Sequence, residues 1–261
     1  MTGVSLHLGG SVILRDVNLE VKDILRPGLT QGQVVGLLGP SGIGKTCLFR
    51  ILAGLDSPDT GSVLIGTEGQ PVERGMVGVV AQNYPLFTHR TVLGNLLVAG
   101  KRAGLSTAKA NEKATGLLQR FGLEEHVRKY PAQLSGGQRQ RMAIAQQFMC
   151  SEHFLLMDEP FSGLDLVAVQ NVCDSICEMA GSDELRTFIV VTHDIIAALE
   201  VSDTIWLLGR DRDAAGGLIP GARVQAAYNL IERGLAWRKG VSATPEFAEL
   251  VREIREVFPR L

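Results

Sequence analysis

Residues 32–46 read GQVVGLLGPSGIGKT, an apolar stretch that runs directly into a glycine-rich turn. The apolar part predicts a buried β-strand, and residues 47–55 after the turn have apolar side chains at helical spacing. A strand, a glycine-rich turn and a helix in this order present backbone N–H groups and a positive helix end to an anion. Residues 39–46 match the pattern GxxxxGK[ST], which is typical of a loop that binds the phosphates of a nucleotide.

The side chains at the end of this loop fit the chemistry of a nucleoside triphosphate with its magnesium ion. The ammonium of Lys45 can reach the β- and γ-phosphate oxygens, and the hydroxyl of Thr46 can bind Mg²⁺. Cys47 follows in the first helical turn, where the dipole would lower the pKa of a thiol and burial would raise it. We predict nucleotide contacts from Gly39, Pro40, Ser41, Gly42, Ile43, Gly44, Lys45, Thr46 and Cys47.

A second anion-binding surface is predicted at residues 134–138, which read LSGGQ. Ser135 offers a hydroxyl, and Gly136 and Gly137 allow backbone amides to approach a charged ligand closely. The stretch behind them, RQRMAIAQQF, has helical character, so a positive helix end and arginine side chains gather there. Two phosphate-binding ends in one chain suggest a nucleotide held between two surfaces.

An acidic pair follows another apolar run, FLLMDEP at 154–160. Asp158, at the end of the predicted strand, is expected to complete the Mg²⁺ site through water. Strand alternation predicts that Glu159 points to the opposite side, where it can act as general base on the attacking water. Charged groups at the ends of buried strands are costly without a compensating ligand, which favours a functional role for Lys45 and Asp158.

Taken together, these motifs resemble those of the ATP-binding cassette (ABC) ATPases, and the resemblance covers about residues 4–210. The motifs stand in the family's order: phosphate loop, Gln82, the LSGGQ signature, the acidic pair, SGLD at 162–165 and His193. The phosphate-loop pattern alone would arise by chance in roughly one chain in a hundred of this length. The ordered set makes coincidence negligible.

The resemblance implies roles for residues whose own pattern is not diagnostic. Gln82 would reach the metal or the water from the joint between the core and a helical insertion. His193 would hold the attacking water and sense the terminal phosphate. The implied catalytic residues are Glu159, His193, Gln82 and Lys45, and the implied metal contacts are Thr46, Gln82 and Asp158.

The resemblance also implies that a second copy of the chain completes the site. Two ATP molecules would be sandwiched in a head-to-tail homodimer, with Ser162 and Asp165 at the interface. The residues that would reach the ATP of the other copy are Ser135, Gly136, Gly137 and Gln138.

Most cassettes place an aromatic residue near the N-terminus, where it stacks on adenine. Alignment of VSLHLGG at 4–10 with that pattern puts Leu8 at this position, with His7 beside it. Leu8 is therefore the expected adenine contact, although three alternatives stay open: His7 stacks instead, the insertion DILRPGLT at 23–30 supplies other contacts, or ATP binds loosely.

Composition narrows the class of protein. The chain has 261 residues, of which 45% are hydrophobic and 21% charged, with a formal net charge of −2, so bulk charge gives no reason to expect nucleic-acid binding. No apolar run approaches the length of a membrane span, and the N-terminus lacks a basic segment followed by an apolar one. We expect a cytoplasmic chain that is peripheral to the membrane through a partner.

The predicted fold is α/β, with a P-loop NTPase (RecA-like) core, antiparallel strands at the N-terminal edge, an inserted helical subdomain and a C-terminal helical extension. The ABC ATPase domain is placed at 1–210, with its core at 1–82 and 154–210 and the helical subdomain at 83–153. In the extension at 211–261 we expect a loop, a short amphipathic segment and a helix that Thr244 and Pro245 open. That helix carries an apolar stripe of Phe247, Leu250, Val251, Ile254 and Phe258.

The segment after Gln82, NYPLFTHRTVLGNLL, suggests what the ATPase drives. In importers this segment forms the groove that receives a helix of the permease, so we expect permease contact near Tyr84 to Asn95, with Pro85, Leu86, Phe87 and Val92 as its apolar surface. A solute-binding protein would be an indirect partner. The residues of these motifs look most like those of the nitrate, sulfonate and taurine branch of importers.

The alternative is a soluble cassette protein that acts in translation, repair or cluster assembly. The translation-type members carry two cassettes in one chain, and the repair-type members insert long coiled coils, neither of which the sequence shows.

Overall fold

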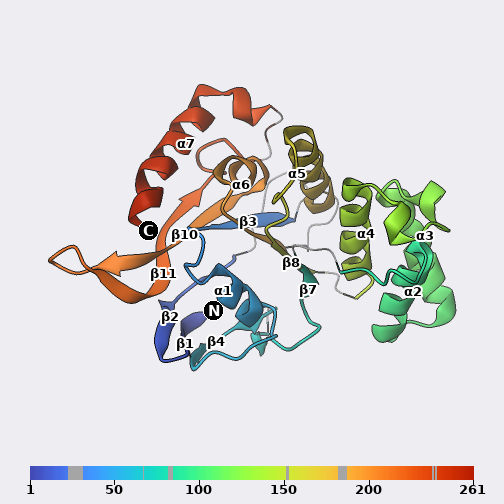
Figure 1. Ribbon diagram of the computed structural model, residues 1–261, viewed down its shortest axis with the longest axis horizontal. Helices are drawn as coiled ribbons and strands as arrows, with labels where there is room; N and C mark the ends of the chain where they lie inside the picture. Colours follow the sequence, from blue (N-terminus) through green and yellow to red (C-terminus); the bar gives the residue numbers. More distant parts are fainter. Residues whose placement is uncertain are drawn as a thin grey trace.

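The computed structural model describes residues 1–22, 32–66, 68–81, 85–150, 153–181, 187–236, 238 and 240–261. The insertion at 23–30, Gln82 and Tyr84 lie outside this part of the chain. Figure 1 shows a strongly curved sheet with helices against it, and a group of helices, α2 to α4, set to one side.

Within the described residues, nine strands form the main sheet in the order β4-β1-β2-β11-β10-β3-β9-β8-β7, and β5 pairs with β6 in a small second sheet. The strands are β1 Thr2–Leu8, β2 Ser11–Val17, β3 Gln33–Leu38, β4 Thr60–Ser62, β5 Leu64–Ile65, β6 Gln70–Pro71, β7 Gly78–Val80, β8 Phe154–Asp158, β9 Thr187–Thr192, β10 Thr204–Arg212 and β11 Leu218–Asn229.

The sheet has two parts with different strand directions. β10, β3, β9, β8 and β7 run parallel to one another, and every residue of β3 is buried. Strands buried on both faces need no alternation of polar and apolar residues, which explains the continuous apolar run of β3. β4, β1 and β2 pair antiparallel, as predicted for the N-terminal strands.

Helices α2, α3, α5, α6 and α7 each begin directly after a residue whose side chain caps them. Thr91, Ser106, Asp165, Asp194 and Thr244 each accept a hydrogen bond from a backbone N–H in the first turn of α2, α3, α5, α6 and α7, respectively. The helices are α1 Lys45–Leu52, α2 Val92–Arg102, α3 Thr107–Arg120, α4 Gly136–Phe148, α5 Leu166–Ala180, α6 Ile195–Val201 and α7 Pro245–Val257, with short 3₁₀ helices η1 Glu124–His126, η2 Pro131–Gln133, η3 Val241–Ala243 and η4 Phe258–Arg260.

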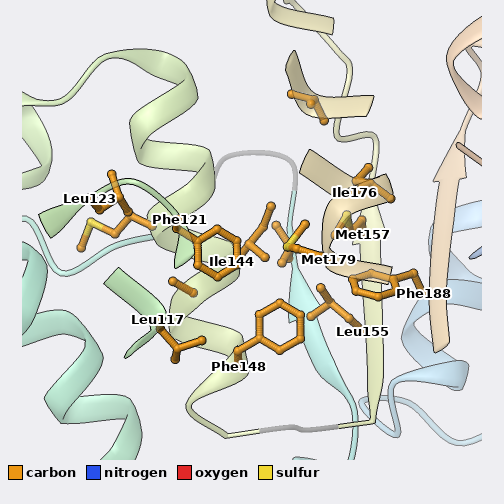
Figure 2. Close-up of a cluster of buried hydrophobic side chains, with 14 of the residues drawn as sticks. Leu117, Phe121, Leu123, Ile144, Phe148, Leu155, Met157, Ile176, Met179 and Phe188 are labelled. Atoms are coloured by element: carbon orange, nitrogen blue, oxygen red, sulfur yellow. The ribbon is translucent and has the colours of Figure 1, made fainter. Parts of the chain in front are cut away.

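Helices α2 to α4 confirm the predicted helical character after residue 83, but they share their hydrophobic core with the sheet. Phe121 of α3's end stacks on Phe148 of α4 at a centroid distance of 6.0 Å, and Phe148 meets Phe188 of β9 edge-on at 6.1 Å. Figure 2 shows these rings in one continuous cluster with side chains of β8 and α5. Movement of α4 relative to the sheet therefore requires repacking of this cluster.

The predicted boundary at 210/211 falls inside a strand, so the C-terminal region is not purely helical. β10 continues to Arg212, and β11 pairs with it antiparallel from Thr204 opposite Asn229 to Arg212 opposite Leu218. The loop predicted from GRDRDAAGG at 209–217 therefore begins inside β10. The amphipathic segment predicted from YNLIERGLAW begins with the last two residues of β11. Alanine and glycine at 221, 222, 226 and 227 give a weak strand signal, and ladder hydrogen bonds override it.

The final helix is confirmed. α7 has Thr244 as N-cap and Pro245 at its first position, and it buries Phe247, Leu250, Val251 and Ile254. These side chains pack with α6 and with Leu38, Ile205 and Leu207 of the sheet. Across the described residues, none of these helices has the length and the apolar character that a bilayer crossing demands.

Candidate nucleotide-binding site

Parallel neighbours in the sheet bring the predicted motifs to one edge. The phosphate loop (residues 39–46) follows β3, His193 follows β9, and Asp158 ends β8. In the ladder, Leu38 lies opposite Thr192 and Asp158 opposite Val191, so the three strand ends are adjacent. Ligands bind at the carboxyl edge of such sheets. The fold therefore assembles the site from segments far apart in the sequence.

Lys45 is held inside the phosphate loop. Its Nζ donates to the carbonyl oxygens of Gly39 at 2.8 Å and Pro40 at 3.1 Å, and it lies 3.8 Å from Oε1 of Glu159. Burial lowers the pKa of Lys45, and the nearby charges of Glu159 and Asp158 oppose that shift. An ammonium carries three N–H donors, and with two donated to these carbonyls the third can serve Glu159 or an anionic ligand.

Glu159 reaches its position by a backbone turn rather than by strand alternation. β8 ends at Asp158, and Glu159 has φ 48°, in the left-handed region that residues with a Cβ seldom adopt. Its N–H donates to the carbonyl oxygen of Val191 at 2.8 Å, which compensates for the strained backbone. The predicted reason for its orientation was wrong, although the carboxylate does face the site. A strained backbone at a candidate catalytic residue favours a functional role.

Thr192 and His193 hold the carboxylate of Glu159. The hydroxyl of Thr192 donates to Oε2 at 2.9 Å, and Nδ1 of His193 lies 2.9 Å from both carboxylate oxygens. Thr192 also accepts from the N–H of Asp194 at 3.1 Å, so its hydroxyl has a fixed direction. Sequence reasoning missed Thr192, because a threonine that ends an apolar strand looks like ordinary strand composition.

Asp158 and Thr46 provide the oxygens that a magnesium ion would need. Burial raises the pKa of Asp158, repulsion from Glu159 raises it further, and Lys45 opposes the shift. A cation at this carboxylate would remove that penalty. Among the described residues no group of three or more His, Cys, Asp or Glu side chains could hold a metal ion alone. In nucleotide sites Mg²⁺ keeps several waters and is held by one or two carboxylates together with the phosphates.

The remaining loop residues divide into exposed and buried ones. Ser41, Gly42 and Thr46 are exposed, and an added Cβ at Gly42 would meet no atom within 4 Å, so its face is open to a ligand. Ile43 is 7% exposed and packs in the core, so only its backbone can contact a nucleotide. Cys47 packs partly against the same core, and burial raises the pKa of its thiol. Burial therefore outweighs the helix dipole at this thiol and disfavours the thiolate.

The signature turn (residues 134–138) caps α4 and lies open. Oγ of Ser135 accepts from the N–H of Gln138 at 3.3 Å, and Oε1 of Gln138 accepts from the N–H of Ser135 at 2.9 Å, which completes a capping box. An added Cβ at Gly136 or Gly137 would meet no atom within 4 Å. No hydrogen bond or ion pair joins this turn to the phosphate loop within the described residues, and Figure 1 shows α4 and α1 well apart.

The start of α5 beside the site is also exposed. Asp165 caps this helix by accepting from the N–H of Ala168 at 2.8 Å. The N–H of Ser162 donates to the carbonyl oxygen of Glu159 at 3.2 Å and closes the turn between them. Leu166 and Val167 are 89% and 72% exposed. Large apolar side chains this exposed favour an interface at this end of the helix.

The family model described as ABC transporter matches residues 23–162 of the chain. This chain belongs to the ABC transporter family. It is 36% identical over 212 residues to the sulfate/thiosulfate import ATP-binding protein CysA of Mesostigma viride, which covers 80% of this chain and 58% of that protein. It is 38% identical over 202 residues to the spermidine/putrescine import ATP-binding protein PotA of Thermotoga maritima, with 75% and 52% covered.

A solved structure agrees with the fold over the whole chain. The structure of cbiO1 from Clostridium perfringens, part of the ABC transporter complex cbiONQ, superposes with a TM-score of 0.74 at 25% identity, covering 99% of this chain and 94% of that chain. The ABC transporter fold expected from the motifs is thus confirmed. The chain spans between half and three-fifths of the length of the two curated relatives.

Leu8, which the alignment predicts to contact adenine, lies at the exposed end of β1. Leu8 is 52% exposed. His7 is not free to stack, because Asp59 accepts from its backbone N–H at 2.6 Å and lies 2.9 Å from its Nδ1. These hydrogen bonds lower the pKa of Asp59. The geometry disfavours the alternative in which His7 replaces the aromatic.

The segment expected to contact a permease is partly buried within this chain. Val92 and Asn95 are fully buried, so neither can form the docking surface, and this part of the prediction was wrong. Val92 belongs to the core, while the side chain of Asn95 bonds to the backbone of Phe87 and to the carbonyls of Arg90 and Thr91. Helical spacing alone did not distinguish the buried face of α2 from its exposed one. Pro85 is exposed and Leu86 is half-buried.

Proposed function

We propose that this chain binds and hydrolyses ATP to energise a membrane importer for a small solute. The single observation that carries the proposal is the contact set of Glu159, whose carboxylate is oriented by Thr192 and His193 beside Lys45. An oriented carboxylate next to a phosphate-binding lysine is the arrangement needed to activate a water for attack on a phosphoryl group.

Each side chain has a defined task in this proposal. Lys45 binds the phosphate oxygens, and Glu159 takes the proton of the attacking water. Thr192 donates to Oε2 and so holds the carboxylate of Glu159 in one orientation. His193 is 54% exposed and can contact both Glu159 and the terminal phosphate. Gln82 is proposed as a further contact from the sequence motif alone.

Mg²⁺ would be held by Thr46 and Asp158, and when bound it would neutralise charge on the phosphate oxygens and stabilise the charge of the transition state. The raised pKa of Asp158 supports this assignment, because a buried carboxylate beside Glu159 gains from a cation.

The signature turn supports a head-to-tail homodimer. Its glycines are open, and α4, which the turn caps, lies apart from α1 of the same chain in Figure 1. The turn can therefore bind phosphate oxygens only in another copy. The exposed Leu166 and Val167 beside Asp165 would be covered in the same assembly.

The importer assignment rests on the relatives, which are import ATP-binding proteins by name. We propose permease subunits as direct partners, a solute-binding protein as an indirect one, and a location at the cytoplasmic face of the membrane. The named relatives handle sulfate or thiosulfate in one case and polyamines in the other, so they do not select a solute. A nitrate, sulfonate or taurine solute stays a prediction from the motif wording.

The test of the proposed function is ATP-driven uptake in vesicles that contain the chain with the permease encoded beside it.

A pull-down tests the permease contact. We expect the double variant Leu86→Asp, Phe87→Asp to recover no permease, because a docked helix would bury the two new charges. Isolated Mg-ATPase should be unchanged. Leu86 packs partly against the core, so the melting temperature of the variant must be measured as well.

Thr115→Asp, on the exposed face of α3, is the matched control and should bind the permease normally. Undiminished permease recovery by the double variant would place the docking surface elsewhere. Failure of the wild-type chain to hydrolyse Mg-ATP would refute the proposed function itself.

A further inference from the structure

His126 lies at the end of η1 and its imidazole meets the signature turn. Its Nε2 is 2.7 Å from Nε2 of Gln138, the last residue of that turn. The histidine is half-buried, and its Nδ1 is a buried atom without a hydrogen-bond partner among the described residues. The contact with Gln138 is therefore the one hydrogen bond of this ring among the described residues.

The N–H of Ser135 determines the orientation of the Gln138 amide and, through it, the tautomer of His126. The N–H of Ser135 can only donate, so the Gln138 atom it meets at 2.9 Å must be the carbonyl oxygen Oε1. The NH₂ of Gln138 therefore points at His126, and Nε2 of the histidine must accept. An imidazole nitrogen accepts only when it carries no proton, so the proton of neutral His126 resides on Nδ1.

This hydrogen bond prevents the Gln138 amide from turning over. A reversed amide would direct its NH₂ at the N–H of Ser135 and lose the capping box. With the capping box in place, Oγ of Ser135 accepts from the N–H of Gln138. Its O–H then finds no acceptor among the described residues and is left to donate to a phosphate oxygen of the second copy.

The residues after His126 contact the start of α2. The N–H of Val92 donates to the carbonyl of Lys129 at 2.8 Å, and the N–H of Leu93 donates to the carbonyl of Val127 at 3.2 Å. These are two of the N–H groups that a helix start leaves without an internal partner. The segment 126–129 thus joins the signature turn to the helix that follows the candidate permease surface.

We propose that His126 is a positioning residue of the signature turn: as a neutral Nδ1–H imidazole it fixes the Gln138 amide and thereby directs the Ser135 hydroxyl at the ATP of the second copy. This inference rests on the proposed function. It assigns His126 no contact with nucleotide, so its effect passes through Gln138 and Ser135.

The experiment compares His126→Leu, which keeps an apolar body but no acceptor, with His126→Gln, whose Oε1 can accept from Gln138. Glu125→Gln, an exposed change on the same turn, is the control. We expect His126→Leu to lower kcat about five- to tenfold, the effect of one lost hydrogen bond, with unchanged Mg-ATP affinity of the monomer. His126→Gln should recover most of the rate, and Glu125→Gln should match the wild type.

A second measurement is independent of hydrolysis. The ¹⁵N shifts of His126 report the tautomer in the full-length chain, and Nδ1–H with an unprotonated Nε2 is expected. Observation of the Nε2–H tautomer, a normal rate for His126→Leu, or a His126→Gln variant as slow as His126→Leu would each overturn the inference. If Ser135→Ala also hydrolyses ATP normally, the shared site and the inference both fail. If Ser135→Ala hydrolyses ATP about tenfold more slowly while His126→Leu is normal, only the inference fails.

Discussion

The phosphate loop and the signature turn both present a helix N-terminus to an anion, yet they are built differently. The phosphate loop encloses its cation: Lys45 is 8% exposed, and its ammonium is held by the backbone and by Glu159. The signature turn has no enclosed charge, and Ser135, Gly136 and Gly137 are exposed. One end holds its cation in place within the chain, while the other is an exposed turn.

This difference assigns the two ends different energetic roles. Electrostatic contacts are strongest where water is excluded and the groups are already in place, as at Lys45 and Glu159. An exposed turn gains comparable strength only when another surface covers it. Binding of ATP should therefore depend mainly on the phosphate loop, and hydrolysis on both ends together.

The largest expected effect is at the enclosed end. Glu159→Gln should bind Mg-ATP but hydrolyse it about 10²- to 10⁴-fold more slowly, because it removes the general base. Gln can still accept from Thr192, so the local structure should persist. Single-turnover hydrolysis measures the rate. Size-exclusion chromatography with Mg-ATP should show a dimer of the variant that is absent without nucleotide.

Glu112→Gln, an exposed change on α3, is the control and should hydrolyse ATP at the wild-type rate. A Glu159→Gln chain that stays monomeric in Mg-ATP would contradict the view that the signature turn acts on a second copy.

A smaller effect is expected at the open end. Ser135→Ala removes both the N-cap and the hydroxyl, so it should lose about 1 kcal/mol of stability and about tenfold in kcat. Ser135→Gly is the matched variant, because glycine at an N-cap costs only a few tenths of a kcal/mol. Thermal melts measure the loss of the cap, and steady-state rates measure the loss of the hydroxyl. If Ser135→Gly restores the rate as well as the stability, the serine is only a cap.

The sequence predicted the parts of the site that depend on local chemistry. The glycine-rich turn after β3, the acidic pair at the end of β8 and His193 after β9 come together because parallel strands place their ends at one edge. Tertiary contacts decided the rest. The left-handed backbone of Glu159, the hydrogen bond from Thr192, the buried side of Asn95 and the pairing of β11 each depend on a segment distant in sequence or on a face that periodicity does not reveal.

The buried charge of Asp158 should lower the stability of the nucleotide-free protein. The pKa of Asp158 is raised above 3.8 by burial and by Glu159, so the folded state binds the proton more tightly than the unfolded state. Its ionisation therefore costs stability at every pH above the folded pKa, and this cost disappears as the pH falls toward 3.8. Asp158→Asn should melt above the wild type at pH 8, with the difference shrinking on acidification.

Mg-ATP should reverse the order of the two proteins, because the wild type gains stability by binding the complex and the variant lacks the metal contact. Differential scanning calorimetry with and without Mg-ATP tests both statements. A variant that melts below the wild type at pH 8 without nucleotide would show that Asp158 stabilises the fold through Lys45.

The smallest expected effect concerns the base rather than the phosphates. We predict from the alignment that Leu8 takes the place of the aromatic that stacks on adenine. Stacking on a base is worth about 1 to 3 kcal/mol in nucleic-acid sites, and a leucine would regain only part of it. On the Glu159→Gln background, Leu8→Tyr should therefore tighten Mg-ATP several-fold in titrations. Catalysis should survive in the wild type, since Lys45 and the loop amides still hold the phosphates.

His7→Ala is the matched change at the neighbouring position, and it should alter ATP affinity little, because the ring of His7 is held by Asp59. Titration of the same proteins with Mg-GTP measures how far the site distinguishes the two bases. If His7→Ala weakens ATP about tenfold, or roughly 1.4 kcal/mol, the ring must leave Asp59 to stack and the alignment is off by one residue. If Leu8→Tyr leaves both affinities unchanged, the base does not lie over β1, and phosphate contacts alone hold the nucleotide at the enclosed end.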